Sequence, residues 1–318
     1  MHRDVGAVQR GLGQYDTKRI TEWVKQYDPS RLVNNASGWT DFGAGDVIDV
    51  HIYPGPGAPR PEEKRAAVLG EFGGLGLPVA GHTWQAEKNW GYKSYKDSAE
   101  LTEAYLKLVA ALRPLVADPG LSAALYTQTT DVEIEVNGLM TYDRAQFKVD
   151  AERVCAANRR VYEPPPKARV VVPTSEKQGY EWRYTTEQPA DGWEKPEFDD
   201  SRWQTGPGGF GREGTPGAVV RTAWTTADIW LRRIVELPAE KLTSPYVRVY
   251  HDEDCYVYVN GVRVAWLPGY TTNYVLAPIS DVSVLKPGRN VLAVRCHQTE
   301  GGQGIDVGIV EVKETPEK

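Results

Sequence analysis

A proline-rich segment, Glu163-Pro-Pro-Pro-Lys167, divides the chain into two parts whose apolar residues repeat with different periods. Before it, helical stripes alternate with short apolar runs. From residue 170 onward, short alternating runs typical of strands recur. Consecutive prolines favour a stiff, extended spacer, and a chain of 318 residues has room for about two domains. The sequence therefore predicts an α/β domain, a linker over residues 164–172 and an all-β domain over residues 173–318.

Composition narrows the class of protein. The formal net charge is −6, and no dense Lys/Arg cluster is present, which argues against nucleic acid as a partner. No run of about 18 apolar residues exists, so we expect no membrane span. Residues 1–13 lack the apolar core of a signal peptide, which predicts a cytoplasmic location for this chain. A secreted or periplasmic location for a longer parent protein stays open.

The cysteines give no sign of a metal site. Cys155, Cys255 and Cys296 are odd in number and lack the spacing of metal ligands. We expect buried thiols with at most one disulfide, between Cys255 and Cys296.

Elements of the first part alternate between helix and strand. Helices are predicted after Thr17, at 62–65, from Asp97-Ser98 onward and over 144–162; strands at 31–36, 46–53, 66–71 and 122–126; and a long loop at 75–96. Such βα alternation is typical of a doubly wound sheet or of part of a (β/α)8 barrel. Polar residues at the strands' C-terminal ends favour the barrel, although only four strands are present and a closed barrel needs about eight.

One of these strands delivers a lone carboxylate. An apolar run ends at Gly70, and Glu71 follows, then Phe72 and two glycines. A charged side chain at the C-terminal end of a buried strand is a common active-site arrangement in α/β barrels. A solvated glutamate in a glycine-rich turn is the alternative.

Five motifs in order over residues 14–163 resemble a known enzyme family. They are Gln14-Tyr-Asp-Thr-Lys-Arg, Asp28-Pro-Ser-Arg-Leu-Val-Asn-Asn-Ala-Ser-Gly-Trp39, Asp49-Val-His-Ile-Tyr-Pro54, Gly70-Glu-Phe-Gly-Gly74 and Tyr126-Thr-Gln-Thr-Thr-Asp-Val-Glu-Ile-Glu-Val-Asn-Gly138. Together they resemble the C-terminal half of the catalytic barrel of glycoside hydrolase family two, which includes β-galactosidases, β-glucuronidases and β-mannosidases.

The resemblance implies roles for individual residues. Glu71 matches the catalytic nucleophile at the end of strand seven of the barrel. The implied sugar site comprises Asn34, Asn35, Asp49, His51, Tyr53, His82, Trp84, Gln128, Asp131, Glu133 and Glu135. For the three acids between 131 and 135, a solvated loop anchored by its own hydrogen bonds is the competing interpretation.

The start of the chain departs from the family pattern. The family's general acid/base is the Glu of an Asn-Glu pair, but Val8-Gln-Arg-Gly-Leu-Gly13 stands here, with Arg10 at the acid's place, and four N-terminal strands are missing. A typical family segment, written in GC-rich codons and read in the adjacent frame, yields residues 4–13. We therefore interpret residues 1–13 as out-of-frame translation and the chain as a truncated descendant or clone of a longer gene.

A divalent metal is a weaker hypothesis. Asp49 and His51 are two apart and so point to one side of their strand, and Glu71 and His82 would add two further ligands of suitable type. The simpler interpretation gives His51 a contact to a sugar hydroxyl and predicts no cofactor.

A half-barrel would leave two open sheet edges and an apolar inner face. Such edges pair or aggregate unless they are covered. A homodimer that completes eight strands from two halves is the predicted solution. Residues 1–13 or the second domain are the alternative covers.

The second part reads as a β-sandwich. Asp199-Asp-Ser-Arg-Trp203, Ile229-Trp-Leu-Arg-Arg and a Val-Asn-Gly hairpin resemble the galactose-binding-like jelly-roll domains of glycosidases. Trp193, Trp224 and Trp266 either stack on sugars or pack in the core, and packing is the more common role.

Three functions follow. The first is a truncated glycosidase that hydrolyses β-galactoside-type bonds by a retaining mechanism, with Glu71 as nucleophile and the acid/base lost. The second is a non-catalytic carbohydrate-binding or assembly protein. The third is a repurposed, metal-assisted hydrolase that uses the opened barrel mouth.

Overall fold

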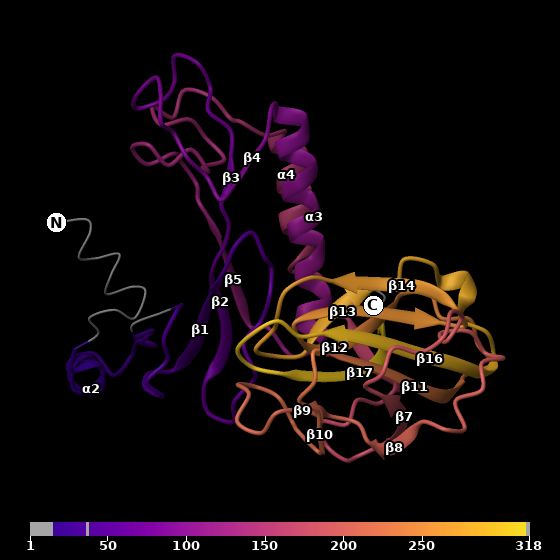
Figure 1. Ribbon diagram of the computed structural model, residues 1–318. Coiled ribbons are helices and arrows are strands. Elements are labelled where there is room, and N and C mark those ends of the chain that lie inside the picture. The colour runs from indigo at the N-terminus through magenta and orange to yellow at the C-terminus, as the bar shows by residue number, and fades with distance from the viewer. Residues whose placement is uncertain (1–14, 36–37, 316–318) are drawn as a thin grey trace. The chain divides into compact units, whose positions relative to one another are not determined.

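The computed structural model describes residues 15–35 and 38–315. Within them the chain is mostly sheet with few helices, and no closed barrel forms. It divides into two compact units, Met1–Pro166 with Thr315–Lys318, and Lys167–Glu314 (Figure 1). The predicted linker is shorter than expected, because Lys167–Val172 is strand β6, which pairs with residues 309–313 of the second unit.

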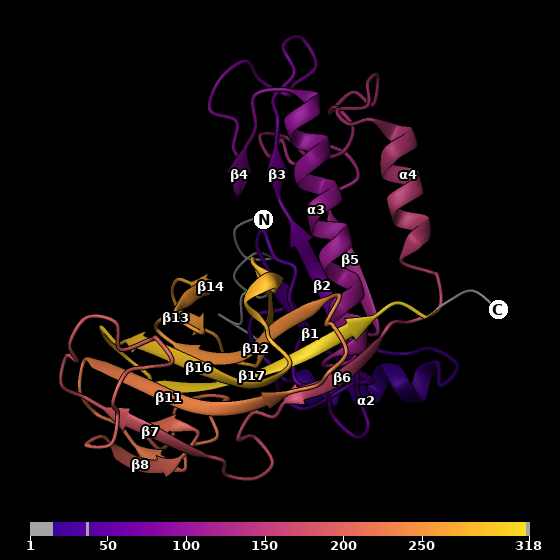
Figure 2. The same ribbon diagram turned by 90° about the vertical axis from the view of Figure 1, so that its right-hand side faces the viewer.

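The first unit is built on a three-stranded parallel sheet. Its order is β1 (Val47–Ile52), β2 (Ala66–Gly73) and β5 (Ala123–Thr127), with β2 in the centre. Helix α3 (Ser98–Ala117) covers one face of the sheet (Figure 2). Its Leu112 and Leu115 pack with Leu69 and Phe72 of β2. These two residues of β2 are three apart because the strand pairing is irregular between them.

Side-chain caps fix the helices. The Asp97 carboxylate accepts a hydrogen bond from Glu100 N at 2.8 Å and begins α3, as predicted. Asp150 accepts from Arg153 N at 3.1 Å and begins α4 (Ala151–Arg160). Such caps satisfy backbone N–H groups that the first helical turn leaves unpaired. Helix α2 (Thr17–Tyr27) is the exception, because no side-chain cap begins it, and its Ile20, Trp23 and Tyr27 are exposed.

Three predicted elements are wrong. Residues 31–35 form no strand and make one backbone bond to Asp46, because the Asp46 carboxylate takes the N–H of Val33. Residues 62–65 form no helix, since Arg65 reaches back to Glu62 and across to Asp41. The helix expected from 144 begins only at Ala151, because residues 141–146 close a turn on the Thr141 hydroxyl.

The long loop 75–96 is partly ordered by strands. Its ends pair as β3 (Leu75–Gly76) and β4 (Lys93–Ser94). Trp90 exchanges backbone hydrogen bonds of 2.9 Å with Ile134 and Val136. The loop is thereby tied to the loop that follows β5.

The second unit is a two-sheet sandwich. One sheet has the order β10-β9-β17-β12-β15, with β6 also on β17; the other has the order β14-β13-β16-β11-β7-β8. The remaining bounds are β7 Glu181–Thr185, β8 Gln204–Pro207, β9 Phe210–Gly211, β10 Thr222–Ala223, β11 Asp228–Leu237, β12 Pro245–Asp252, β13 Asp254–Val259, β14 Val262–Leu267, β15 Val275–Pro278, β16 Gly288–His297 and β17 Gly304–Lys313, with a 3-10 turn at Val282–Val284.

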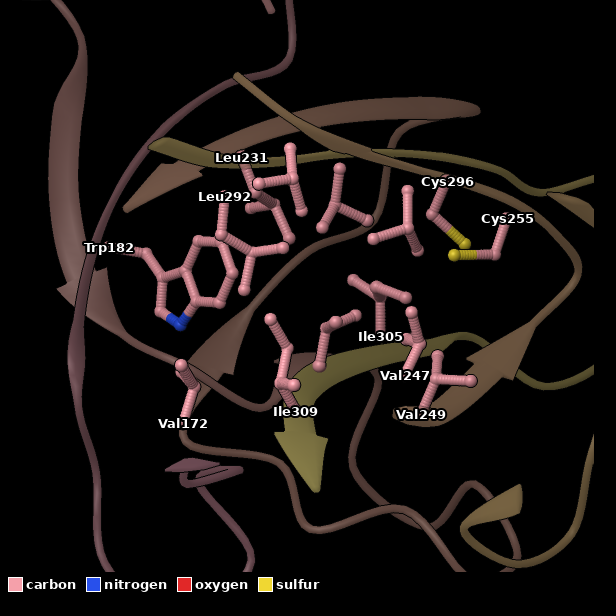
Figure 3. Packing of buried hydrophobic residues seen from close by; sticks show 14 of the residues in the cluster. Val172, Trp182, Leu231, Val247, Val249, Cys255, Leu292, Cys296, Ile305 and Ile309 are labelled. Atoms are coloured by element: carbon pink, nitrogen blue, oxygen red, sulfur yellow. The ribbon is translucent and has the colours of Figure 1, made fainter. Parts of the chain in front are cut away.

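Both sheets contribute to one core. Val247, Val249, Ile305 and Ile309 of one sheet meet Leu231 and Leu292 of the other, with Trp182 at one end (Figure 3). Strand alternation explains this core, because every second residue of each strand points inward.

The cysteines and tryptophans divide between core and surface. Cys255 and Cys296 are buried, free and opposite each other on β13 and β16, with their thiols pointing toward one another (Figure 3). Cys155 is exposed on α4, which corrects the expectation of three buried thiols. Trp224 is buried in the core, Trp193 is half-buried, and Trp266 is exposed. Packing is therefore the role of Trp224 but not of Trp266.

Candidate functional site

The C-terminal ends of β1 and β2 bring Glu71 and His51 together. The two are Cα partners, just after a register shift at Val50/His51 in the parallel pair. Parallel strands end at the same edge of a sheet, so side chains near their ends converge. Tyr53, directly after β1, completes the group.

One oxygen of Glu71 accepts a hydrogen bond from Tyr53 and lies close to the ring of His51. The Tyr53 hydroxyl donates to Glu71 Oε2 at 2.5 Å, and His51 Nδ1 lies 3.1 Å from the same oxygen. The Glu71 side chain keeps 27% of its surface exposed, whereas His51 is buried. Burial, then the bond to Glu71, raises the pKa of Tyr53 well above its usual range, so its hydroxyl stays a donor at neutral pH. The arrangement gives an oriented, solvent-accessible carboxylate.

Asp49 is a buried side chain that holds the backbone next to Glu71. Its side chain is 3% exposed. Its two oxygens accept hydrogen bonds from Asn34 Nδ2 and Gly70 N, each at 2.7 Å. A Cβ at Gly70 would lie 2.2 Å from Asp49 Oδ1, so only glycine fits there. Asp49 therefore fixes the strand before Glu71 and is poorly placed to meet a ligand.

Asn35 differs from Asn34 in its surroundings. Its Nδ2 is buried and has no hydrogen-bond partner among residues 15–35 and 38–315. A buried donor without a partner is costly, so this amide is a natural place for a ligand oxygen or a water molecule.

Aromatic rings that the site prediction missed surround these polar groups. Tyr92 stacks on Tyr53 with centroids 3.8 Å apart, and Trp90 meets Tyr92 edge-on at 5.4 Å. Trp39 meets the His51 ring edge-on at 6.0 Å. Trp39, Trp90 and Tyr92 are all exposed. The aromatic content of loop 75–96 was the available signal, but the sequence could not show which of its rings fold back onto β1.

The acidic loop after β5 is held mainly by its own contacts. Lys148 Nζ lies 2.6 Å from Asp131 Oδ1, and both side chains are buried. Gln128 Nε2 donates to Asn137 Oδ1 at 3.1 Å, and Asn137 Nδ2 donates to Glu135 Oε1 at 3.0 Å. These contacts agree with an anchored loop at Glu135, but Asp131 is buried in an ion pair, so the expectation of a solvated acid is wrong for Asp131.

Glu133 lies apart from these contacts. It is exposed, at a turn where its φ is 51°. Of the three acids in this loop, it is the one most open to solvent.

His82 and Trp84 belong to a different cluster. His82 Nδ1 is 2.8 Å from Asp143 Oδ2, and Gln146 Nε2 is 2.8 Å from His82 Nε2. Trp84 meets Tyr142 edge-on at 5.1 Å. The Thr141 hydroxyl, then the Ala145 N–H and His82, lower the pKa of Asp143 to about 2. Both nitrogens of His82 are thus engaged within this cluster.

The metal hypothesis gains no support from this placement. Within the described part of the chain, no group of three or more His, Cys, Asp or Glu side chains is arranged to hold a metal ion.

Two further expectations concern the whole chain. Among residues 15–35 and 38–315, no helix is long and apolar enough to span a membrane. Residues 8–13, on which the loss of the acid/base was argued, lie outside the described residues.

Comparison with known proteins gives matches among solved structures alone. No protein-family model and no curated protein matches this chain. A glycosyl hydrolase family 2 member from Bacteroides cellulosilyticus matches at 20% identity with a TM-score of 0.32, over 42% of this chain and 20% of its own. A Bacteroides uniformis β-glucuronidase matches at 16% identity with a TM-score of 0.34, over 46% of this chain and 18% of its own. A Ruminococcus gnavus β-glucuronidase in complex with D-glucuronic acid matches at 18% identity with a TM-score of 0.33, over 45% of this chain and 30% of its own.

These structural similarities support few conclusions about this chain. Their TM-scores lie below 0.5, so we rest no conclusion about mechanism or substrate on them. This chain spans only 20% of the Bacteroides cellulosilyticus protein. The solved structures that it resembles are family 2 glycosyl hydrolases, in agreement with the resemblance in the sequence.

Proposed function

We propose that this chain is a glycosidase-like hydrolase fragment in which Glu71 is the nucleophile. The observation that carries the proposal is the hydrogen bond from the Tyr53 hydroxyl to Glu71 Oε2, with the His51 ring 3.1 Å from the same oxygen, on a carboxylate that is still open to solvent. A donor fixed on one oxygen orients the carboxylate. The three parallel strands would then be part of an opened (β/α)8 barrel, and the second unit a galactose-binding-like jelly roll.

The proposed chemistry is a two-step retaining mechanism that lacks its general acid. A Glu71 oxygen attacks the anomeric carbon, the glycosidic C–O bond breaks, and the leaving oxygen takes the electron pair. Water then cleaves the glycosyl ester, which releases the sugar and restores the carboxylate. The mechanism uses no cofactor, and the substrate class is a carbohydrate.

The proposed mechanism has no identified general acid to protonate the leaving oxygen. Retaining enzymes place it about 5–5.5 Å from the nucleophile. Asp49 is unsuited, because both of its oxygens accept hydrogen bonds in a buried position. We therefore expect poor turnover of natural glycosides, by about 10²–10⁴-fold for a missing general acid. Aryl glycosides with good leaving groups need that proton less.

A second candidate function is non-catalytic carbohydrate binding at the same place. The exposed rings of Trp39, Trp90 and Tyr92 beside Glu71 favour it. Ring faces of this kind can cover the apolar face of a sugar whether or not catalysis follows.

The test is hydrolysis of a panel of aryl β-glycosides, with and without azide or formate. Small anions can attack a glycosyl-enzyme that lacks its acid/base. The panel is run on the wild-type chain, on Glu71→Gln and on Glu87→Gln, an exposed acid of the loop over residues 75–96. We expect anions to speed turnover of the wild type and of Glu87→Gln, and Glu71→Gln to be inactive.

Other outcomes separate the two functions. Equal activity in wild type and Glu71→Gln would exclude Glu71 as nucleophile. An absence of turnover, combined with sugar binding that Trp90→Ala abolishes, would establish the binding function instead.

A further inference from the structure

A row of outward-facing side chains crosses one sheet of the second unit. Trp266 of β14 is the Cα partner of Tyr256 of β13, Tyr256 is the partner of Arg295 of β16, and Arg295 is the partner of Trp230 of β11. Their neighbours along these strands, such as Val257, Val294 and Leu231, point into the core. The four residues, here called the aromatic row, therefore lie side by side on the outer face. With strands about 4.8 Å apart, the row is roughly 14 Å long.

The rings and the guanidinium of the row are fixed against one another. Trp266 and Tyr256 are stacked within 19°, with centroids 6.4 Å apart. The Arg295 guanidinium lies 5.9 Å from the Tyr256 ring and 5.6 Å from the Trp230 ring. Asp228 Oδ1 holds Arg295 at 3.0 Å. Ion pairing and cation–π contacts thus keep the row rigid before any ligand arrives.

The adjacent row on the same face is covered at Arg232, and the aromatic row is covered at Trp230, which is 6% exposed, but open at its Trp266 end. Arg232 of the adjacent row donates to the carbonyl oxygens of Trp193 and Lys195 and to the Asp200 carboxylate, so the loop over residues 193–200 lies across it. Trp266, by contrast, leaves 56% of its surface exposed. The indole of Trp266 therefore presents an exposed apolar surface beside Tyr256, and no described residue of its own unit covers it.

An unpaired cation borders the open end of the row. Arg263 is on β14, opposite Tyr258 across β13, and it is exposed. No carboxylate pairs with it among the residues that the structure describes, whereas Arg295, Arg232 and Arg183 all have aspartate partners. Arg263 therefore offers a positive charge at this end of the row, while Asp254 of β13 lies on the same face on the other side of Tyr256.

We propose that the aromatic row binds a polysaccharide that carries acidic sugars. The apolar faces of successive sugar rings would lie on Trp266 and Tyr256, and a sugar carboxylate would pair with Arg263. The aromatic row is one ring wide and has charged side chains beside it, so it suits a linear polysaccharide. A protein partner would need a broader surface, because a stable protein interface buries about 800 Å² per partner around an apolar centre. This site is independent of Glu71 and needs no catalysis.

Affinity electrophoresis of the full chain tests the proposal. Native gels contain either polygalacturonate, an acidic polymer, or hydroxyethylcellulose, a neutral one. The variants are Trp266→Ala and Arg263→Gln. The matched control is Trp23→Ala, which removes an indole of similar exposure, 59%, from α2. Thermal melts of each variant check folding, and both substituted sites are exposed.

We expect polygalacturonate to retard the wild type and Trp23→Ala equally, and Trp266→Ala at least fivefold less. Arg263→Gln should lose most retardation by the acidic polymer, and hydroxyethylcellulose should retard the wild type weakly. Absence of retardation of the wild type by polygalacturonate would overturn the proposal, as would equal retardation of Trp266→Ala. If Trp266→Ala instead dissolves a self-associated species on a sizing column and no polymer is bound, the row is a protein interface and the proposal is wrong.

Discussion

The two units differ in how completely they bury their own apolar residues. The sandwich has one large core cluster that both sheets share. The α/β unit has two smaller clusters, around α3 and on either side of Tyr126. It also leaves Ile20, Trp23, Tyr27, Trp39 and Leu125 exposed. A sandwich closes on itself, whereas a three-stranded parallel sheet covered on one face does not.

This contrast bears on function, because the incomplete unit carries the candidate nucleophile. Buried polar contacts add to the two apolar clusters of this unit. The Asp131–Lys148 pair in the loop after β5 is the clearest case. Local stability of this unit should therefore respond sharply to single polar substitutions.

The largest effect is expected for Lys148→Ala. Lys148 Nζ also donates to Leu77 O at 3.0 Å and Val136 O at 2.8 Å, so its loss leaves the Asp131 carboxylate buried without its cation. Breaking a buried ion pair costs about 3–5 kcal/mol. Calorimetry of the full chain should show a lower Tm for one transition only. Lys96→Ala, which breaks an exposed pair with Glu100, is the control, with an expected loss below about 0.5 kcal/mol. Equal losses in the two variants would contradict the assignment.

A smaller effect is expected in the sandwich, from Asp306. Burial raises its pKa to about 6, while Tyr274 Oη and Ser175 N donate to Oδ2. The unfolded pKa is about 3.9, so between these values the folded state holds more protons than the unfolded state. Stability therefore falls as pH rises from about 4 to 6, by about 2–3 kcal/mol at most.

Urea unfolding of wild type and Asp306→Asn at pH 4 and pH 7 measures this term. The stability difference between the two proteins should change with pH in the expected direction, with Asp306→Asn gaining relative to wild type at pH 7. Asp191→Asn, at an exposed site, should track the wild type at both values. Parallel pH dependence of wild type and Asp306→Asn would refute the assignment.

Sequence reasoning succeeded for elements that are determined by the periodicity of their apolar residues or by a helix cap. The cap at Asp97 and the inward alternation of β12 and β16 could be read directly, whereas the cap at Asp150 was missed. It failed where a distant side chain takes a backbone group, as Asp46 does for Val33. A single sequence does not show which of many carboxylates will arrive there.

The candidate site divides in the same way. The family resemblance grouped Glu71, His51, Tyr53 and Asp49, and the structure brings them together at the ends of neighbouring parallel strands. His82 was grouped with them on residue type alone, and the structure places it with Asp143 and Gln146. Tyr92 was missed because only the folded loop shows that its ring lies on Tyr53.

The smallest predicted effect concerns how the open sheet is covered. β5 pairs only with β2 in the described part of the chain, and its Leu125 leaves 54% of its surface exposed on the face away from α3. We propose that a second copy of the chain covers this face. Leu125→Lys should then weaken dimerisation about tenfold, or about 1.4 kcal/mol, in sedimentation at several concentrations. Leu32→Lys makes the same change at an exposed loop site and should dimerise like the wild type. A wild-type chain that stays monomeric at every concentration would show instead that the α/β unit tolerates an open face, and the contrast with the closed sandwich would then be one of exposed surface alone.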